Sequence, residues 1–248
     1  MSGRVVLVTG ASRGIGLAVA GRFGAAGDAV VVTSRDEARL VEAAESVGAR
    51  PVRCDHTDPA DVRALATDLE ADGLDVLVHC VGGNLDLSDP LPDAPGLDRP
   101  SLERHAERWR ANLDLNVVSA ILTTTALGPL LRAGGSVVTV GTIGAEYAGS
   151  SYGAAKAALA AWTAGLSAEL GPAGISANTV SPGYIAGTDF FHGTLSDERR
   201  ERLVAATHDG RAGTVDDVAE TVYFLASAGA RHVTGQNLHV NGGAFTTR

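Results

Sequence analysis

Tyr152 and Lys156 lie four residues apart in the stretch SYGAAK (151–156), and together they could transfer a proton. An (i, i+4) pair lies on one face of a helix, and the Ala- and Leu-rich stretch from Tyr152 to Leu170 predicts a helix. A free tyrosine has a pKa of about 10, which a neighbouring cation lowers by favouring the phenolate. The pair therefore predicts a tyrosine that exchanges a proton near neutral pH. The alternative is a surface lysine beside a core tyrosine.

Lys156 is also unusual in composition. It is the only lysine in a chain that holds 20 lysines and arginines together, so every other member of that set is an arginine. Arginine replaces a surface lysine at little cost, but not a lysine whose compact ammonium must fit beside another titrating group. The retention of this one lysine favours proton transfer by the pair over a surface lysine beside a core tyrosine.

A glycine-rich loop near the N-terminus predicts a nucleotide site. The apolar run Arg4–Thr9 is typical of a buried parallel strand. The loop 10–16 follows it and leads into the amphipathic stretch Leu17–Ala26. In such a strand–loop–helix unit, glycines allow a tight turn, a close approach of phosphate and close helix packing, and free N–H groups bind pyrophosphate. The expected contacts are Gly10, Ser12, Arg13, Gly14, Ile15 and Gly16.

The second expected strand, Ala29–Thr33, bears on the choice of cofactor. An acidic residue after this strand would bind the ribose 2′-hydroxyl of NAD, but here the neutral Ser34 and then Arg35 follow. Two guanidinium groups, those of Arg13 and Arg35, suit a 2′-phosphate. We therefore expect NADP(H). The alternative is that both arginines are solvated surface residues.

Short apolar runs alternate with longer amphipathic stretches along the whole chain. This predicts a Rossmann-type doubly wound α/β fold, with a seven-stranded, mostly parallel sheet and helices on both faces. Because no repeat or linker divides residues 1–248, we expect a single dinucleotide-binding catalytic domain. The later strands are expected at 50–54, 74–80, 135–140, 175–180 and 237–243, and helices at 59–72, 102–131 (with a break near 112–116), 152–170 and 215–226.

Two segments interrupt the alternation. Residues 87–100 hold four prolines and predict an irregular surface loop insertion, either a tolerated insertion or a wall of the substrate mouth or a subunit contact. Residues 184–213 include a polar, partly helical excursion that we interpret as a mobile substrate lid, the alternative being an ordinary amphipathic surface helix.

Asn116 lies in an apolar stretch, and a buried asparagine needs hydrogen-bond partners. It either bonds a local carbonyl or also holds a water.

Composition narrows the class of protein. The chain is 45% hydrophobic and 20% charged, with a net charge of −9, which disfavours nucleic acid and anionic membranes as partners. No apolar run approaches the roughly 20 residues of a membrane span. The two cysteines, Cys54 and Cys80, make neither a disulfide framework nor a metal quartet. We expect a reduced, cytoplasmic protein with no metal.

Taken together, these motifs resemble the short, single-domain branch of the short-chain dehydrogenase/reductase family. Thr9-Gly10-x-x-x-Gly14-Ile15-Gly16 is similar to the cofactor loop of that family, and Tyr152-x-x-x-Lys156 to its catalytic pair. Ser181-Pro182-Gly183 and Val240-Asn241-Gly242-Gly243 are similar to its later signatures. The resemblance implies that Asp55 contacts the adenine ring. Independently of it, we expect further cofactor contacts in the loops after the fourth and sixth strands, because strand carboxyl ends form the ligand crevice in this fold. These are Gly82, Pro182, Gly183 and Ile185.

The resemblance also implies roles for the catalytic residues. Tyr152 would be the proton donor in carbonyl reduction, and Lys156 would lower its pKa and hold the nicotinamide ribose hydroxyls. Asn116 would anchor a water in the proton relay. A homotetramer or homodimer is implied as well.

The chain departs from the family pattern at two places. The usual Asn-Asn-Ala-Gly after the fourth strand is His79-Cys80-Val81-Gly82, and Gly141-Thr142 takes the place of Gly-Ser after the fifth. Thr142 is closer to Tyr152 than the family serine commonly is. Thr139 has a more usual spacing but should lie inside the strand. We choose Thr142, at the strand end, as the group that binds the carbonyl oxygen.

The sequence thus predicts an NADP(H)-dependent oxidoreductase that reduces a ketone to a secondary alcohol, or the reverse, with polyketide-type ketones and 3-oxoacyl thioesters as first candidates. A non-catalytic NADP-binding sensor or assembly protein is the alternative, kept open by the Ser-to-Thr change. An isomerase or dehydratase with the same cofactor site is a third possibility.

Overall fold

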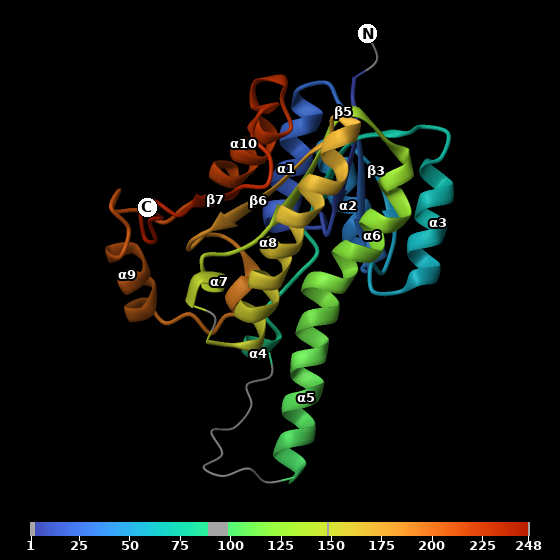
Figure 1. Ribbon diagram of the computed structural model, residues 1–248. Coiled ribbons are helices and arrows are strands. Elements are labelled where there is room, and N and C mark those ends of the chain that lie inside the picture. Colours follow the sequence, from blue (N-terminus) through green and yellow to red (C-terminus); the bar gives the residue numbers. More distant parts are fainter. Residues whose placement is uncertain (1–2, 89–98, 148, 248) are drawn as a thin grey trace.

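The computed structural model describes residues 3–88, 99–147 and 149–247. Seven strands form one sheet in the order β3-β2-β1-β4-β5-β6-β7 (Figure 1). All the strand pairings in the described ranges are parallel, so the expected doubly wound fold is confirmed. The strands are β1 (Val5–Thr9), β2 (Ala29–Ser34), β3 (Arg50–Arg53), β4 (Leu74–His79), β5 (Leu131–Val140), β6 (Ser176–Pro182) and β7 (Asn237–Val240).

Helices connect these strands and lie on both faces of the sheet. They are α1 (Gly14–Ala25), α2 (Glu37–Val47), α3 (Pro59–Leu69), α4 (Leu85–Ser88), α5 (Arg99–Leu113), α6 (Ser119–Leu127), α7 (Gly144–Tyr147), α8 (Ser151–Leu170), α9 (Asp197–Ala205) and α10 (Val215–Leu225). The π-helical turn Asp114–Val118 joins α5 to α6. The expected break near 112–116 is therefore a local widening of a continuous helix, and α5 projects beyond the body of the molecule (Figure 1).

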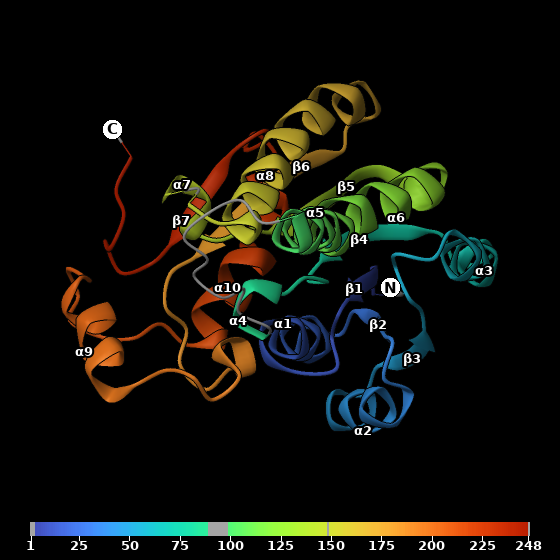
Figure 2. The ribbon, with the colours of Figure 1, turned by 90° about the horizontal axis from the view of Figure 1, so that it is seen from below.

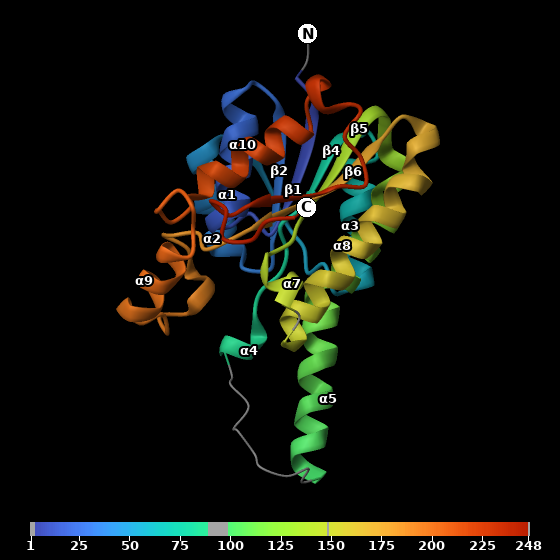
Figure 3. The same cartoon turned by 60° about the vertical axis from the view of Figure 1, so that its left-hand side comes forward.

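The strands alternate their side chains between two separate cores. Val6 and Val8 of β1 pack with α1, α2 and α10 on one face, whereas Leu7 packs with α3, α6 and α8 on the other. Figure 3 shows α1 and α10 on one side of the sheet and α3 and α8 on the opposite side. Because both faces are covered at the centre of the sheet, the central strands β1 and β4 are apolar almost throughout, which is why each is recognisable as a short apolar run.

Several boundaries differ from expectation, among them the start of β5 and both ends of the segment 87–100. β5 begins at Leu131 rather than at residue 135, because Leu131 pairs with Leu74 ahead of an irregularity in the β4–β5 register. The segment 87–100, expected to be irregular, contributes Leu87 and Ser88 to α4 and its last two residues to α5. The remainder of that loop lies outside the described residues.

The helical stretch Leu102–Leu130 contains an 18-residue window with a mean hydropathy of 1.3, so it is long and apolar enough to cross a membrane by length and composition alone. Polar residues such as Asp114 and Asn116 interrupt the stretch, so it passes by its mean hydropathy and not as one continuous apolar run. Of its most apolar window, 39% is buried inside the structure, with Val117, Ala120 and Leu127 in the core. A core helix of a globular protein passes the same test.

Two buried histidines bind threonines within the core. The ring of His56 lies between the hydroxyls of Thr33 and Thr123, at 2.7 Å from each. The Nε2 atom of His79 lies 2.8 Å from the hydroxyl of Thr124. Burial lowers the pKa of His56 to about 4 and that of His79 to about 3, so both rings are neutral at pH 7.

These rings predict a pH-dependent stability. The unfolded chain protonates a histidine near pH 6.5, whereas folded His56 accepts a proton only near pH 4. The contribution of neutral His56 to the free energy of unfolding is therefore fully present above pH 6.5. This contribution falls by at most about 3 kcal/mol as the pH drops from 6.5 toward 4. We expect His56→Gln to have a shallower loss of unfolding free energy across this window in denaturant titrations. The exposed-site variant His232→Gln should keep the wild-type slope, and equal slopes in all three proteins would contradict the assignment.

Candidate active site

The strand order places a crevice between β1 and β4. From this pair, the chain winds outward to β2 and β3 on one side and to β5, β6 and β7 on the other. In open α/β sheets, ligands bind outside the carboxyl ends of the strands at such a switch point. The loops that follow β1, β2, β4, β5 and β6 therefore meet there, and they carry about half of the expected site residues. Of the others, Tyr152 and Lys156 lie on α8, and Asn116 lies in the π-helical turn.

The glycine loop has the conformation that its sequence predicts. Gly10 has φ +64°, and a Cβ on it would lie 2.8 Å from the backbone nitrogen of Val81 after β4. Only glycine therefore allows β1 and β4 to come this close at their ends. Helix α1 starts at Gly14, and no side chain caps its first turn, which leaves that turn as a binding site for an anion.

A cavity of about 150 Å³ opens beside this loop. Its lining includes seven expected cofactor contacts: Gly10, Ser12, Arg13, Ser34, Arg35, Asp55 and Gly82. The carboxylate of Asp55 accepts hydrogen bonds from the N–H and the hydroxyl of Thr57. Burial alone would raise the pKa of Asp55, but these hydrogen bonds and the nearby Arg35 guanidinium hold it below its usual value.

Both arginines expected at a 2′-phosphate face carboxylates in this structure. Arg13 forms an ion pair of 2.8 Å with Asp189, between the glycine loop and the segment after β6. Arg35 lies 3.9 Å from Asp55. The two guanidinium groups thus lie at one cavity, and both are largely exposed.

At the other end of the crevice, α8 brings Tyr152 and Lys156 to the ends of β4 and β5. Lys156 is only 4% exposed, and its Nζ donates a 2.7 Å hydrogen bond to the carbonyl of Val140 in β5. A Cβ on Gly82 would lie 2.9 Å from this Nζ and 2.7 Å from Oδ1 of Asn116. The ammonium therefore points into the crevice, not into bulk water.

The pKa of Tyr152 differs from expectation. Burial raises it, and a hydrogen bond with Thr142 offsets only part of the rise. Burial also lowers the pKa of Lys156 to about 8. The lowered tyrosine pKa expected from the (i, i+4) spacing is not found, because desolvation disfavours the phenolate and the ammonium binds a strand carbonyl.

The two candidate threonines lie in different surroundings. Thr142 follows the end of β5, its hydroxyl accepts a 3.1 Å hydrogen bond from the N–H of Gly144, and it lies near enough to Tyr152 to offset part of the rise in the pKa of that phenol. Thr139 is fully buried in the sheet, with its hydroxyl 3.0 Å from that of Thr163 and 2.9 Å from that of Thr179. Only Thr142 of the two therefore faces the tyrosine.

Asn116 lies in the π-helical turn and is 1% exposed. Its amide nitrogen donates to the carbonyls of Asn112 and Gly83, at 3.0 Å each, and its Oδ1 accepts from the N–H of Gly83 at 3.1 Å. The sequence predicted that Asn116 bonds a local carbonyl, alone or together with a water, and the structure shows the local carbonyls. The side chain fixes the loop after β4 next to Lys156.

The segment expected as a lid, residues 184–213, is closed at its base. Ile185 and Gly213 form an isolated bridge, with backbone hydrogen bonds from Ala186 to Gly213 and from Gly213 to Tyr184. Between these ends lie the 3₁₀ turn Asp189–Phe191 and helix α9. Helix α9 lies at the periphery, away from the sheet (Figure 2).

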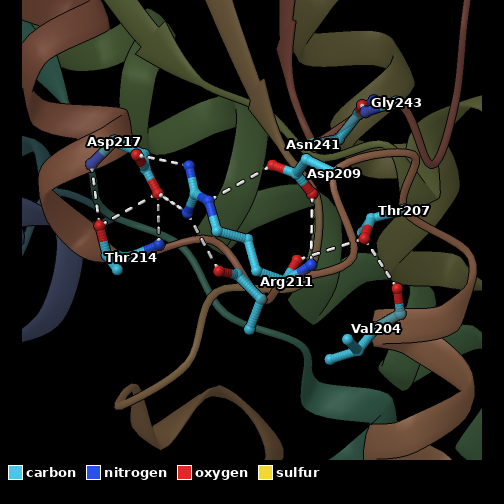
Figure 4. A network of polar contacts seen from close by, with 9 residues as sticks. Val204, Thr207, Asp209, Arg211, Thr214, Asp217, Asn241 and Gly243 are labelled. Carbon is cyan, nitrogen blue, oxygen red and sulfur yellow. Dashed lines mark hydrogen bonds and ion pairs between the residues drawn. The ribbon is translucent and has the colours of Figure 1, made fainter.

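An ion-pair network fixes the far end of this segment. Arg211 binds both carboxylate oxygens of Asp217, at 2.7 and 3.1 Å, and Asp217 forms a capping box with Thr214 at the start of α10 (Figure 4). The N–H groups of His208 and Asp209 donate to the carbonyl of Gly242, after β7. The base of the lid is thereby attached to α10 and to the C-terminal loop.

Aromatic rings from segment 184–213 lie beside Tyr152. The ring of Phe190 lies 5.6 Å from that of Tyr152, and Phe191 lies 5.0 Å from Phe190. Tyr184 continues the row at 6.0 Å from Phe191. Tyr152 is 8% exposed, and this aromatic row lies beside it.

Pro182 and Gly183 lie at the end of β6, and Ile185 lies at the base of segment 184–213. The N–H of Gly183 donates to the carbonyl of Val240, and Ile185 is 6% exposed. These residues border the crevice but do not line the cavity beside the glycine loop.

Sequence reasoning missed several residues of the site. The cavity is also lined by Cys54, His56, Cys80, Val81 and Leu115. The first four lie directly after β3 or β4, so their position at strand carboxyl ends was the available signal. Leu115 and Asp86, which contacts the start of α8, depend on contacts between distant segments and carry no local signal.

Comparison with known proteins agrees with this geometry. Residues 10–245 match the family model described as "Enoyl-(Acyl carrier protein) reductase". The chain is 35% identical to the short-chain reductase protein NovJ of Streptomyces niveus, over 96% of this chain and 93% of that protein. This chain belongs to the short-chain dehydrogenase/reductase family.

Further members of the family agree over the whole length. The 3-oxoacyl-[acyl-carrier-protein] reductase FabG of Escherichia coli (strain K12) is 31% identical, with 98% of each chain covered. The crystal structure of a blue fluorescent protein from a metagenomic library, in complex with NADPH, has a TM-score of 0.84 at 30% identity and covers 99% of each chain. The family supports a nicotinamide-dependent oxidoreductase that acts on small molecules.

Proposed function

We propose that this chain is an NADP(H)-dependent enzyme that reduces a ketone to a secondary alcohol, or catalyses the reverse reaction, with Tyr152 as acid and base. The observation that carries the proposal is the placement of Thr142 beside Tyr152, with Lys156 one turn further along α8 and bonded to the Val140 carbonyl at the end of β5. These groups lie at the end of the same crevice that holds the glycine loop. A hydrogen-bonding hydroxyl, a phenol and a buried ammonium are the groups that carbonyl reduction needs.

The crevice fits a dinucleotide. Gly82 leaves open a space that a Cβ would fill against Asn116 and Lys156, and the uncapped start of α1 suits a pyrophosphate. When bound, the nicotinamide ring supplies or accepts the hydride. The residues proposed to hold the cofactor are Gly10, Ser12, Arg13, Gly14, Ile15, Gly16, Ser34, Arg35, Asp55, Gly82, Tyr152, Lys156, Pro182, Gly183 and Ile185.

Each catalytic side chain has a separate task. Thr142 donates a hydrogen bond to the substrate oxygen, and Tyr152 gives that oxygen a proton as it becomes a hydroxyl. The raised pKa of Tyr152 keeps the phenol protonated at neutral pH, which is the form that reduction requires. Lys156 holds the ribose hydroxyls beside the phenol, while Asn116 fixes the loop after β4 and anchors a water of the proton relay.

The preference for NADP(H) is attributed to Arg13 and Arg35. Both guanidinium groups line the cavity beside Ser34, where an acidic residue would repel a 2′-phosphate. Asp189 and Asp55 partner them in the structure, and a phosphate with its higher charge competes for the same donors.

Cofactor preference gives a direct prediction. We expect Arg35→Ala, and separately Arg13→Ala, to lower kcat/KM for NADPH by about 10- to 100-fold, since a hydrogen bond to a charged group contributes about 1.5–3 kcal/mol. The value for NADH should change little. Arg63→Ala, at an exposed position on α3, is the matched control. Equal losses with NADPH and NADH would contradict the assignment of these arginines to the 2′-phosphate.

The substrate is proposed to enter beneath the lid, residues 184–213. The row Phe190, Phe191 and Tyr184 beside the phenol favours an apolar carbonyl compound. Polyketide-type ketones and 3-oxoacyl thioesters are the first candidates, and the name of the FabG relative supports the second class.

The alternative is a non-catalytic NADP-binding sensor or assembly protein, favoured by the threonine in place of the family serine. NADPH oxidation by the purified protein, measured against a panel of ketones, 3-oxoacyl thioesters and quinones, separates the two. Turnover of any carbonyl compound supports the enzyme. NADPH binding without turnover of the panel would favour the sensor.

We also propose a homodimer or homotetramer in the cytoplasm. The projecting helix α5 leaves Leu102 50% exposed and Trp109 44% exposed, and exposed apolar side chains on a single helix favour a subunit contact. Sedimentation of the purified chain would measure the assembly directly.

A further inference from the structure

Asp86 lies on the short helix α4 and binds the start of the catalytic helix α8. Its Oδ2 accepts a 3.1 Å hydrogen bond from the backbone N–H of Tyr152. Its Oδ1 accepts a 2.6 Å hydrogen bond from the hydroxyl of Ser151 and a 3.2 Å bond from the amide of Asn112. One carboxylate thus receives three donors, from α5 and from the first turn of α8.

These contacts stabilise a negative charge on the carboxylate of Asp86. The first N–H groups of a helix have no partner within it, and a carboxylate there also complements the helix dipole. Ser150 caps the N–H of Gly153, whereas the N–H of the proposed acid itself is held by Asp86. Hydrogen bonds to an ionised acceptor are the stronger kind, so Asp86 fixes the backbone from which the phenol projects.

The Asp86 carboxylate is also linked, through Asn112, to the π-helical turn that holds Asn116. Asn112 is fully buried and donates to Ser151 at 2.8 Å as well as to Asp86. Its backbone carbonyl accepts from the amide of Asn116 at 3.0 Å. The Asp86 carboxylate therefore connects the start of α8 to the π-helical turn that carries Asn116.

We propose that Asp86 is a positioning residue, which holds the phenol of Tyr152 in register with Asn116 and the crevice without touching the substrate. This inference rests on the proposed function, because positioning has a catalytic effect only if Tyr152 transfers the proton. A displacement of about 1 Å at reacting groups can cost about 100-fold in rate.

Asp86→Asn tests the proposal. Asparagine keeps the shape but replaces one carboxylate oxygen with an NH₂ group, which cannot accept, so the variant loses either the bond from the Tyr152 N–H or the bonds from Ser151 and Asn112. We expect kcat for ketone reduction to fall by about 10- to 100-fold, with KM for the ketone and Kd for NADPH within about twofold, since only the orientation of the acid changes. The matched control is Asp58→Asn, because Asp58 also accepts a helix N–H, at the start of α3. Its kcat should equal the wild-type value.

Amide hydrogen exchange supplies a readout that does not depend on turnover. In Asp86→Asn, exchange of the Tyr152 N–H should accelerate by about 10-fold or more, while exchange at Ala60 stays unchanged. If the wild type reduces no ketone, the proposed function fails, and this exchange rate alone decides whether Asp86 holds α8. An unchanged exchange rate, or a wild-type kcat in Asp86→Asn, overturns the proposal.

A second variant covers the case in which Asp86→Asn does not fold. Ser151→Ala removes the 2.6 Å hydrogen bond to Asp86 and the 2.8 Å hydrogen bond from Asn112, and it leaves the carboxylate in place. We expect kcat to fall by about 3- to 10-fold with KM unchanged. A wild-type kcat in Ser151→Ala would likewise overturn the proposal.

Discussion

Tyr152→Phe is expected to lower kcat for ketone reduction by about 100- to 10,000-fold, which is the range that a positioned acid contributes. The change removes one hydroxyl from a side chain that is 8% exposed and leaves the ring packed against Phe190. Because the glycine loop and the arginines are untouched, Kd for NADPH should stay near the wild-type value. Stopped-flow NADPH oxidation and fluorescence titration of NADPH measure the two quantities.

Tyr223→Phe is the matched control for this variant. Tyr223 lies on α10, where its ring packs against Phe23 and Arg22, far along the chain from the proposed acid. It should keep the wild-type kcat. Full ketone reduction by Tyr152→Phe would show that the proton comes from another group and would end the assignment of Tyr152.

Lys156→Arg is expected to be nearly as damaging, although it conserves the charge. The ammonium is 4% exposed and lies between the Val140 carbonyl and the space beside Gly82. A planar guanidinium is larger than this site and presents its donors in a fixed fork. Displacement of the crevice backbone should lower kcat/KM by about 100-fold or more, and Kd for NADPH should rise as well. Steady-state kinetics and NADPH titration would measure both losses.

The converse exchange, Arg63→Lys on the surface of α3, should leave the kinetics unchanged. Lys156→Met separates charge from shape, because it keeps the length of the stem without the ammonium. If Lys156→Met and Lys156→Arg both reduced ketones at the wild-type rate, the lysine would have no part in the reaction. Circular dichroism of each variant would verify that the protein is folded.

The sheet could be predicted from the sequence because its strands are buried on both faces. Runs such as Val5–Val8 and Val76–Val78 are continuously apolar, and the helices between them are amphipathic. The start of β5 was missed because Arg132, Gly134 and Gly135 interrupt the apolar run, and the extension depends on pairing with Leu74. Pairing between distant segments has no local signature.

The site could be predicted where a motif lies on one segment. The glycine loop and the pair Tyr152–Lys156 are local patterns, and the structure brings both to one crevice. The ion pair of Arg13 with Asp189 joins residues far apart in sequence. The direction of the Tyr152 pKa shift depends on burial, which spacing alone does not specify.

Because Ile185 and Gly213 form a bridge, the segment between them can be exchanged as a unit. Its two ends emerge side by side from fixed points, at the end of β6 and before α10, so its length and fold can change without altering the sheet. Loop exchanges with adjacent ends cost little chain entropy. Grafting the corresponding stretch from a relative should therefore transfer substrate preference while the hydride-transfer machinery beneath stays intact.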